Sequence, residues 1–546
     1  MTRSRWLLPA VGIALFALLL GTTLIWPTST TPPVENAAST VTLAQAPPLS
    51  AAPTAVTVGA LPPTTTSAPS PTTATAPSPT TVTAAPPAST PVATSVPRAP
   101  YDGWVDPASM GGPWGDIVPG VLTFRGSPTR RWHGSGPVPT EPVVAWRFPA
   151  EAQMCSMSSV AGVEQEWCGM GWTGQPAVFE RQGRTWVVFG AFDARVHFLD
   201  GATGEKIIPD FAVADIIKGS VTADPDGYPL VYVGSRDGRL RILAIDRARP
   251  TELWGLDADE TGPRMWNNDW DASPLVLDDH LFEGGENSRF HVVRLNRSYD
   301  DDGLVAVDPE LVWDVAGWDD DLLAEVDSNV SIENSPLIVG NTLYFANSGG
   351  LVQGWDIAGL ADGVEPTRVF RFWAGDDVDA TLIPDEDGML YVGVEYERET
   401  LRSLELGQIL KLDPSRPDDP LVWAVEARTK VGTGVWATPA IYRDLVVVPT
   451  ADGEVLGISR AGGGVRWKLE IPGPVWSSPT IVDDVMVIGD CTGRVRAFDL
   501  HVDGTRPTQI WEVPTGICVE ASAAIWDGTV YIGSRDGHLY ALRDPS

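Results

Sequence analysis

The sequence contains a hairpin pattern that recurs along the chain. Residues 231–246 read VYVGSRDGRLRILAID, and residues 530–544 read VYIGSRDGHLYALRD. In both copies an apolar run is followed by Asp-Gly and a second alternating run, which is typical of two antiparallel strands joined by a tight turn. Weaker copies lie at residues 186–200, 343–356, 445–459 and 485–499, and a split copy lies at 390–393 and 408–413. Such a chain folds as an array of similar units.

Two further features define the repeat unit. A short segment of the form Ser/Thr-Pro-apolar precedes several hairpins, as in DASPLV from Asp271 and WSSPTI from Trp476. Each unit closes with a tryptophan, and these tryptophans, 44 to 60 residues apart, are Trp254, Trp313, Trp373, Trp423, Trp467 and Trp511. One unit is therefore an inner strand, a hairpin and an outer strand. Four-stranded units of this length predict the blades of a β-propeller.

We predict an all-β domain over residues 101–546, an eight-bladed β-propeller of four-stranded antiparallel blades. The 108 residues from Trp146 to Trp254 suffice for two blades. The last blade, residues 512–546, has only three strands, and the strand at residues 143–148 would supply the fourth and close the ring. A seven-bladed ring is the alternative, because blade boundaries are weakly marked in a sequence.

These motifs resemble those of the propeller family with pyrroloquinoline-quinone-like (PQQ-like) repeats. The resemblance covers about residues 120–546 and is carried by the VYVGSRDG and VYIGSRDG hairpins, the LDGATGE turn at 199–205, the inner-strand segments and the closing tryptophans. The family name describes the repeat and not a bound cofactor. The resemblance implies either a quinone-dependent alcohol or sugar dehydrogenase, or a non-enzymatic scaffold such as an outer-membrane assembly lipoprotein or a sensor module of a bacterial kinase.

Residues 1–26 predict a cytoplasmic tip and a transmembrane anchor. Arg3 and Arg5 precede an uncharged run of 21 residues from Trp6 to Trp26, and a bilayer core needs about 20 apolar residues. Tryptophans suit both interfaces, and the arginines favour the cytoplasmic side. We expect a single-pass protein of the cell membrane with its propeller outside the cytoplasm. A cleaved signal peptide, which would make the protein secreted, is the alternative.

Residues 27–100 consist mainly of Pro, Thr, Ala and Ser, with Glu35 and Arg98 as the only charges. This composition cannot bury a core, and its prolines favour extended backbone. We therefore predict a disordered stalk that holds the propeller away from the membrane. Glycosylation of its threonines is a further hypothesis.

Charge separates the propeller from the rest of the chain. The 38 basic and 71 acidic residues give a net charge of −33, and residues 101–546 hold 35 of the basic and 70 of the acidic ones. A charge of −35 repels nucleic acid and anionic lipid headgroups. It favours basic envelope proteins or cations as partners, with simple solubility as the alternative, and it leaves the oligomeric state open.

Four cysteines in an oxidising compartment favour disulfides, and three pairings are open. Cys155 and Cys168 bracket a polar insertion before the first inner strand. Cys491 falls in the hairpin turn of the seventh blade, and Cys518 opens the inner strand of the eighth. We predict the pairs 155–168 and 491–518, with reduced thiols as the alternative. Since no CxxC pair exists, the cysteines do not predict a metal site.

The repeat places one residue of each inner strand at the predicted central channel. This ring consists of Thr173, Lys218, Asp271, Glu333, Asp379, Trp436, Trp476 and Glu520. The repeats align loosely in the second and fifth blades, so Lys218 and Asp379 are placed to within one residue. Converging carboxylates favour a cation, and adjacent tryptophans favour a planar or sugar ligand. The alternative is a water-filled mouth lined by solvated polar groups.

A second candidate is the loop at the entry to the third blade, formed by Trp266, Asn267, Asn268, Asp269 and Trp270. Aromatic and amide side chains on an exposed loop are typical of recognition surfaces. They also cap the ends of propellers, and both interpretations stay open.

No motif in the sequence assigns a catalytic residue, a metal ligand or a cofactor. The six histidines are scattered, and no nucleophile elbow, phosphate-binding loop or Rossmann fingerprint is present. The family resemblance implies that a quinoprotein would carry adjacent cysteines and a calcium site of Glu, Asn and Asp. No two cysteines are adjacent here, and Glu333, Asn334 and Asp271 are the nearest substitutes for the calcium ligands.

We therefore expect a membrane-tethered extracytoplasmic propeller in a bacterial cell envelope, acting as a protein-interaction scaffold or as a ligand-binding or sensing module. A PQQ- and calcium-dependent dehydrogenase is the alternative.

Overall fold

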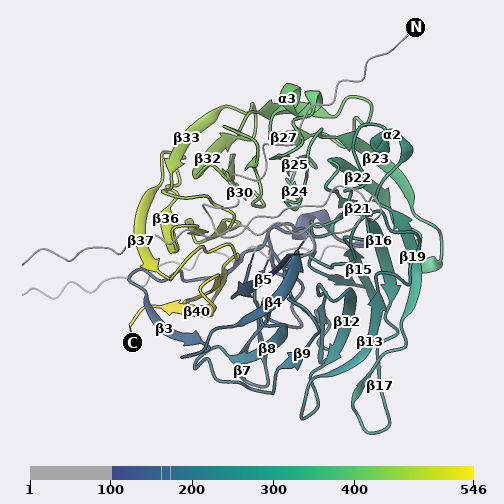
Figure 1. Cartoon of the computed structure of the whole chain (residues 1–546), viewed down its shortest axis with the longest axis vertical. Helices are drawn as coiled ribbons and strands as arrows, with labels where there is room; N and C mark the ends of the chain where they lie inside the picture. Colours follow the sequence, from purple (N-terminus) through teal and green to yellow (C-terminus); the bar gives the residue numbers. More distant parts are fainter. Residues whose placement is uncertain (1–100, 161–162, 172–173, 546) are drawn as a thin grey trace, which may run out of the picture. The chain divides into compact units, whose positions relative to one another are not determined.

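The computed structural model describes residues 101–160, 163–171 and 174–545, and these form eight blades around a ring (Figure 1). The blades follow one another in sequence order. The prediction of eight antiparallel blades is confirmed, and the seven-bladed alternative is wrong. The predicted anchor and stalk, residues 1–100, and the ring candidate Thr173 lie outside the described residues.

The first four blades, each given from its innermost to its outermost strand, are built as follows. Blade 1 is β1 (Gly120–Val121), β6 (Ala177–Arg181), β7 (Arg184–Ala191), β8 (Arg195–Asp200) and β9 (Phe211–Ala212). Blade 2 is β10 (Thr222–Ala223), β11 (Leu230–Val233), β12 (Arg239–Ala244) and β13 (Thr251–Asp257). Blade 3 is β14 (Leu275–Leu277), β15 (His280–Gly284), β16 (Arg289–Arg294) and β19 (Glu310–Ala316). Blade 4 is β20 (Leu337–Val339), β21 (Thr342–Phe345), β22 (Leu351–Asp356) and β23 (Thr367–Trp373).

The other four blades continue the ring. Blade 5 is β24 (Ile383–Pro384), β25 (Leu390–Gly393), β27 (Ile409–Leu412) and β28 (Leu421–Val425). Blade 6 is β30 (Ala440–Tyr442), β31 (Leu445–Pro449), β32 (Glu454–Ser459) and β33 (Val465–Glu470). Blade 7 is β34 (Thr480–Val482), β35 (Val485–Asp490), β36 (Arg494–Asp499) and β37 (Thr508–Pro514). Blade 8 is β2 (Gly134–Ser135), β38 (Ala524–Trp526), β39 (Thr529–Ser534), β40 (His538–Arg543) and β3 (Val143–Phe148).

A few short elements lie between the blades. Three two-stranded ribbons pair β4 (Cys155–Val160) with β5 (Val163–Cys168), β17 (Ser298–Tyr299) with β18 (Val305–Ala306), and β26 (Glu395–Tyr396) with β29 (Thr433–Gly434). The short helices are η2 (Pro107–Ser109), α2 (Asp320–Leu323), η3 (Leu360–Asp362) and α3 (Leu401–Leu406).

The two best-matched repeats form the same hairpin. β11 pairs with β12 through Tyr232 and Ile242, and β39 pairs with β40 through Tyr531 and Ala541. The Asp-Gly turn needs a residue with positive φ, and glycine supplies it, with φ of 88° at Gly238 and 95° at the corresponding position of the second hairpin. Local turn chemistry therefore favours the same register in these two hairpins.

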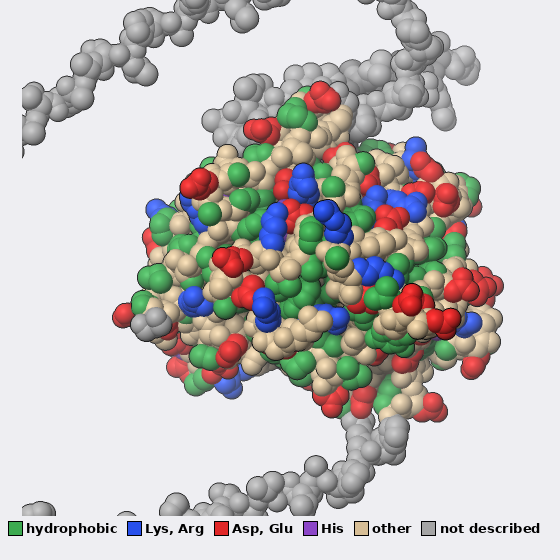
Figure 2. All heavy atoms as spheres, turned by 90° about the horizontal axis from the view of Figure 1, so that it is seen from below, with side chains coloured by type: hydrophobic (Ala, Val, Ile, Leu, Met, Phe, Trp, Pro, Cys, Tyr) green, Lys and Arg blue, Asp and Glu red, His purple; other side chains and the backbone are tan. Residues whose placement is uncertain are grey.

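The surface carries charge of both signs, and Figure 2 shows basic side chains lying among acidic ones on one face. Other charged side chains, which are largely buried, link neighbouring blades. The buried guanidinium of Arg297, which follows the third strand of blade 3, lies 2.7 Å from Asp224 of blade 2. Arg460 of blade 6 lies 3.0 Å from Asp385 of blade 5. Ion pairs thus reinforce the contacts between blades.

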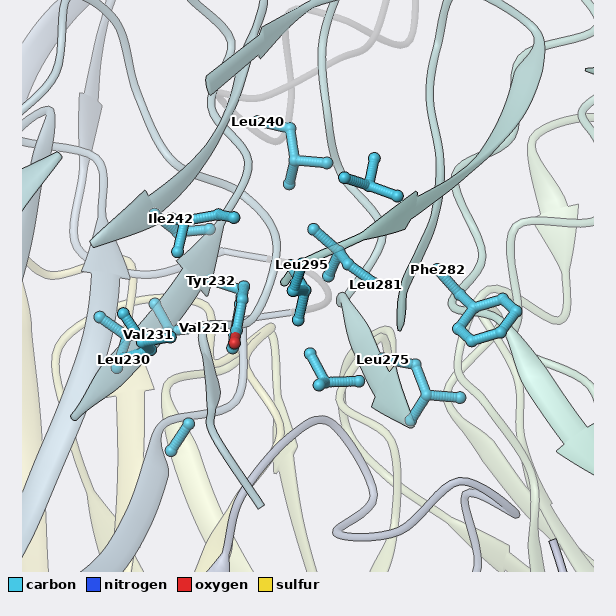
Figure 3. Packing of buried hydrophobic residues seen from close by; sticks show 14 of the residues in the cluster. Val221, Leu230, Val231, Tyr232, Leu240, Ile242, Leu275, Leu281, Phe282 and Leu295 are labelled. Atoms are coloured by element: carbon cyan, nitrogen blue, oxygen red, sulfur yellow. The ribbon is translucent and has the colours of Figure 1, made fainter. Parts of the chain in front are cut away.

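Blades pack face to face, and both faces of their central strands are buried. Figure 3 shows the packing between blades 2 and 3, where Tyr232 and Ile242 lie opposite Leu281 and Leu275. All four side chains are almost fully buried. Burying apolar surface on both sides of every blade is what holds the ring together.

The ring closes through a strand from the N-terminal side of the domain. β3 pairs with β40 in antiparallel register, with Trp146 opposite Ala541, and in Figure 1 the blue β3 lies beside the yellow β40. The prediction that residues 143–148 complete the last blade is confirmed. β2 adds a parallel strand on the inner side of the same blade.

A belt of hydroxyl groups joins the inner strands. In six of the blades the hydroxyl of the inner-strand Ser or Thr accepts a hydrogen bond from the backbone amide of the equivalent residue in the preceding blade; among the described residues, the Ser273 hydroxyl of blade 3 accepts none. The observed bonds are Gln175 to Ser220 (2.9 Å), Ser273 to Ser335 (3.0 Å), Ser335 to Thr381 (3.0 Å), Thr381 to Thr438 (3.0 Å), Thr438 to Ser478 (2.9 Å) and Ser478 to Ser522 (3.3 Å). This belt holds the inner strands at one level.

Residues 120–134 fill the axis of the ring next to the hydroxyl belt. Two fully buried arginines anchor this segment. Arg125 donates to the carbonyls of Thr438 (2.8 Å) and Pro439, in blade 6, and of Pro479, in blade 7. Arg130 donates to the carbonyls of Pro336, in blade 4 (2.8 Å), and Ser273, in blade 3 (3.0 Å). We call residues 120–134 the plug, because they close the axis beyond the belt.

Both predicted disulfides are present. Cys155–Cys168 closes the β4–β5 ribbon, and Cys491–Cys518 links blade 7 to blade 8. The β4–β5 ribbon leans on blades 1 and 2, where Ser156 donates to the carbonyl of Phe192 at 2.6 Å and Arg236 donates to that of Ser159 at 2.9 Å.

Candidate functional site at the channel mouth

The described members of the predicted ring lie at equivalent places in seven successive blades. Each stands two residues before its blade's residue in the hydroxyl belt, and they are Lys218, Asp271, Glu333, Asp379, Trp436, Trp476 and Glu520. They therefore form a layer next to the belt, on the side away from the plug. We call this layer the mouth. Lys218 and Asp379, whose alignment was loose, follow the same register as the others.

Each blade adds two more residues to the mouth. One precedes the ring residue by two positions, and the other follows the blade's second strand; in blades 2 to 8 a backbone hydrogen bond of 2.8 to 3.0 Å joins them. From blade 2 to blade 8 these triplets are Ile216/Lys218/Arg236, Asp269/Asp271/Glu286, Ser331/Glu333/Ser348, Asp377/Asp379/Glu395, Gly434/Trp436/Ala451, Pro474/Trp476/Cys491 and Cys518/Glu520/Arg535.

Sequence reasoning identified the second residue of each triplet and missed most of the third residues. Arg236 and Arg535 are the arginines of the repeated Gly-Ser-Arg-Asp motif itself. Reading that motif position through the other blades leads to Glu286 and Glu395. The signal was therefore present in the repeat that defines the fold.

The blade 3 triplet is neutralised by cations from blade 2. The Lys218 ammonium contacts Asp269 at 3.0 Å, Glu286 at 3.1 Å and Asp271 most closely of all. Arg236 lies 3.5 Å from Asp269. Burial alone would lower the pKa of Lys218, but the surrounding carboxylates outweigh it and raise that pKa. The Lys218 ammonium thus forms ion pairs with all three buried carboxylates of the blade 3 triplet.

The ring carboxylate of blade 8 is also paired. Arg535 lies 3.1 Å from Glu520 within the same triplet. Its guanidinium packs over the rings of Trp167 and Phe192, at 5.1 and 4.9 Å from their centroids. The first residue of this triplet, Cys518, is joined to Cys491 of the blade 7 triplet. This side of the mouth is rigid and locally neutral.

The blade 5 triplet has no such counter-charge. Among the described residues, Asp377, Asp379 and Glu395 form no ion pair. Burial raises the pKa of all three carboxyl groups well above the usual range, and the neighbouring carboxylates raise it further. Glu333 of blade 4 is buried beside them, and burial followed by the charge of Asp379 raises its pKa as well.

Two tryptophans follow the acidic blades around the mouth. Trp436 and Trp476 stack with ring centroids 5.2 Å apart and an interplanar angle of 15°. Both side chains are partly exposed. Offset-stacked indoles form a flat apolar surface with a negative face, which suits a planar or cationic group. Going around the ring, Glu333, Asp379 and this tryptophan pair come from four successive blades.

The predicted recognition loop packs into the fold. Trp270 is fully buried, with its ring centroid 5.3 Å from that of His291, and Asp269 is fully buried in the blade 3 triplet. The Asn267 amide donates to Glu286 at 2.8 Å. Trp266 and Asn268 are half-buried. The loop is therefore not an exposed surface. Its burial fits the capping interpretation, because its polar groups contact or belong to the blade 3 triplet.

The substitutes considered for a quinoprotein calcium site do not converge. The Asn334 side chain donates to the carbonyl of Val378 at 2.9 Å and accepts from the amide of Ala346 at 3.0 Å, so both of its ends join backbone. Asp271 is held by Lys218. Each cysteine bonds a partner distant in sequence. Glu333, Asn334 and Asp271 therefore do not fit a calcium ion shared with a quinone.

The fold and its mouth define an eight-bladed propeller of the PQQ-like repeat type. The family model described as outer membrane protein assembly factor BamB matches residues 407–545, which include blades 6 to 8. The match covers less than half of the chain, and over those residues it agrees with the PQQ-like repeats that the motifs predict. No protein of curated function matches the sequence.

Solved structures show the same architecture. Quinohemoprotein alcohol dehydrogenase from Comamonas testosteroni aligns with a TM-score of 0.53 and 15% identity, over 78% of this chain and 80% of that one. Quinohemoprotein alcohol dehydrogenase ADHIIG from Pseudomonas putida HK5 gives 0.53 and 12%, over the same shares. BamB from Moraxella catarrhalis gives 15% identity over 74% of this chain and 99% of that one, but its TM-score of 0.36 is too low to support an argument. At these identities the likeness shows the fold alone.

Within the part of the chain that the structure describes, no helix is both long enough and apolar enough to cross a bilayer.

Proposed function

We propose that this protein is a membrane-tethered binding propeller of a bacterial cell envelope, whose mouth receives a positively charged segment of a partner protein. One observation carries the proposal. The stacked pair Trp436 and Trp476 adjoins the two blades whose ring carboxylates, Asp379 and Glu333, form no ion pair within the described residues.

The chemistry of this half of the mouth suits lysine or arginine side chains. A guanidinium or ammonium over an indole face gains about 0.5–2 kcal/mol, more where water is excluded. Carboxylates alongside add charge complementarity, which steers association as well as strengthening it. The net charge of −35 on residues 101–546 would draw basic partners towards the propeller.

The comparisons assign no role, because the solved structures of similar fold are alcohol dehydrogenases. The matching family model is described as an outer membrane protein assembly factor, and the misfit of the calcium substitutes argues against a quinone-dependent dehydrogenase. Two disulfides favour an oxidising compartment. The predicted anchor, residues 6–26, and the stalk, residues 27–100, would place the propeller there.

Binding of a labelled oligo-arginine peptide to the full-length chain, followed by fluorescence anisotropy, tests the proposed mouth. We expect saturable binding that weakens by about tenfold in Trp436→Ala/Trp476→Ala, the loss of roughly 1.4 kcal/mol of cation–π attraction. Asp419→Asn/Asp444→Asn is the charge control, because both carboxylates are largely exposed and leave the mouth unchanged. Equal losses in the two variants would show non-specific attraction and refute the proposal.

Cell fractionation tests the tether. We expect the full-length chain in the membrane fraction, and external protease should release an intact propeller by cutting within residues 27–100. A chain found wholly in the culture medium without residues 1–26 would support the secreted alternative and refute the anchor.

A further inference from the structure

The triplets of blades 3 and 5 have the same composition and the same backbone geometry. Asp269/Asp271/Glu286 and Asp377/Asp379/Glu395 both read Asp, Asp, Glu. In each triplet the glutamate amide donates to the carbonyl of the first aspartate, at 3.0 Å for Glu286 and 2.8 Å for Glu395. In each, carboxylate oxygens of all three residues lie within 4.8 Å of one another. Blade 3 is therefore an internal reference for blade 5.

The two triplets differ in what the preceding blade supplies. The ring residue of blade 2 is Lys218, and its ammonium contacts all three carboxylates of blade 3. The ring residue of blade 4 is Glu333, which faces the blade 5 triplet as a fourth acid. Blade 2 supplies an ammonium to the blade 3 triplet. At the equivalent position, blade 4 supplies a carboxyl group to the blade 5 triplet.

Two buried oxygens of the blade 5 triplet lack partners, which is an independent sign of a missing ligand. Oδ1 of Asp377 and Oε1 of Glu395 form no hydrogen bond with any residue that the structure describes, although these residues are only 4% and 2% exposed. A buried oxygen without a partner costs about 1–3 kcal/mol. Buried oxygens of this kind indicate that a water molecule or an ion binds there.

The nearest guanidinium is engaged elsewhere. Arg398 donates to Asp327 at 2.9 Å, to the carbonyl of Asn329 at 2.9 Å and to the carbonyl of Ser348 at 3.1 Å. Its charge opposes the rise in the pKa of Asp377 but does not outweigh burial. The described part of the chain therefore supplies no cation that pairs with the blade 5 triplet.

We propose that Asp377, Asp379 and Glu395 bind a divalent metal ion of the calcium type, with Glu333 as an additional acidic neighbour. An all-oxygen anionic set suits hard cations, and ligands 2.3–2.6 Å from Ca²⁺ lie at most about 5 Å apart, which matches the triplet. The burial of Asp377 and Glu395 favours a small ion over the end of a partner's side chain.

Asp379 is the partly exposed member of the triplet and gives the ion access from the mouth. The site uses the same mouth as the proposed function but does not depend on its peptide ligand. A metal there would also fix the blade 4 and blade 5 side of the mouth, as the Cys491–Cys518 disulfide fixes the opposite side.

Calorimetric titration of the metal-depleted full-length chain with CaCl₂, without any peptide, tests this site. We expect one saturable calcium ion per chain and a rise in melting temperature. In Asp377→Asn/Glu395→Gln the affinity should fall by at least about tenfold, since even indirect changes at metal sites cost that much. Tb³⁺ luminescence excited through tryptophan provides a second readout, because Trp436 and Trp476 share the mouth.

Glu333→Lys is the decisive variant, because it recreates the blade 3 arrangement in blade 5. We expect its ammonium to replace the ion, so calcium binding should be lost while the metal-free protein melts at a temperature equal to or higher than that of the wild type. Asp419→Asn/Asp444→Asn should bind calcium like the wild type. Unchanged calcium binding in both Glu333→Lys and Asp377→Asn/Glu395→Gln, or no stoichiometric binding to the wild type, would overturn the proposal.

The peptide assay of the proposed function is run separately, with and without calcium. Loss of calcium binding with peptide binding retained would reject only the metal site. The opposite result would reject only the proposed partner.

Discussion

His197 in blade 1 shows how a single buried side chain ties stability to pH. Its ring lies 3.1 Å from Asp193 and 3.1 Å from Asp210. Burial alone would lower the pKa of His197, but hydrogen bonds to the two carboxylates outweigh it and raise that pKa. The protonated form therefore stabilises the fold. This stabilisation is complete below the unfolded-state pKa of about 6.5 and is lost as pH rises through the folded-state value.

We predict that His197→Gln lowers the free energy of unfolding by about 1.5–3 kcal/mol at pH 6, the range for hydrogen bonds to charged groups. The difference from wild type should shrink as pH rises towards 9. Urea denaturation at several pH values measures it, with His501→Gln at a more exposed turn as the control. A difference that grows with pH would contradict the assignment.

Arg130 of the plug is held by two groups of the plug and by two carbonyls of distant blades. Its guanidinium donates to the carbonyls of Pro336, Ser273 and Phe124 and to the hydroxyl of Thr123. Because Arg130 is fully buried, removing it takes a donor from three buried carbonyls, whereas the Thr123 hydroxyl still accepts from Thr222.

We therefore predict that Arg130→Met lowers the free energy of unfolding by roughly 3 kcal/mol or more, at about 1–3 kcal/mol per orphaned acceptor. Arg184→Met, at a largely exposed arginine, should change it by less than about 0.5 kcal/mol. Chemical denaturation compares the two, and equal effects would mean that the plug does not brace the ring.

At the scale of elements, ring closure depends on two strands that lie between β1 and β6 of blade 1 in the sequence. β3 completes blade 8 through β40, and β2 flanks β38. A sheet edge without β3 would expose unpaired backbone groups and the apolar face of the last blade.

A chain that begins at residue 101 should therefore fold cooperatively, whereas one that begins at residue 150 should not. A chain that begins at residue 137 keeps β3 but loses the plug, and we expect it to fold with reduced stability. Near-ultraviolet circular dichroism and limited proteolysis distinguish these states. Equal cooperativity of the chains starting at 101 and 150 would contradict closure by β3.

The blades were predictable because their signals are local. The Asp-Gly turns, the inner-strand motif and the closing tryptophans each act within one repeat, so they appear in the sequence at regular spacing. The register of the mouth followed from the same repeat, including Asp379, whose blade is interrupted by α3.

Contacts between distant segments were not predictable. The plug has no counterpart in the repeat, and Arg125 reaches acceptors more than 300 residues away. For Trp270 the sequence left both recognition and capping open, because composition alone does not show that the fold buries this side chain. The triplets could not be assembled from the sequence alone. To assemble them, one must know which residue after each second strand lies beside the ring residue in space.

On the scale of the whole molecule, the mouth is divided into two halves. Blades 2, 3 and 8 neutralise their own charges through Lys218, Arg236 and Arg535. Blades 4 to 7 present carboxylates without ion pairs and the stacked tryptophans. We infer that binding takes place at this second half, while the first half and the plug act as a rigid support.

The most direct test of a binding propeller against a quinone enzyme is titration of the calcium-loaded full-length chain with pyrroloquinoline quinone, followed by tryptophan fluorescence. We predict no saturable quenching, because Asn334 and Asp271 are committed to other contacts. Tight quenching that requires calcium and disappears in Glu333→Ala would contradict this and establish a dehydrogenase site.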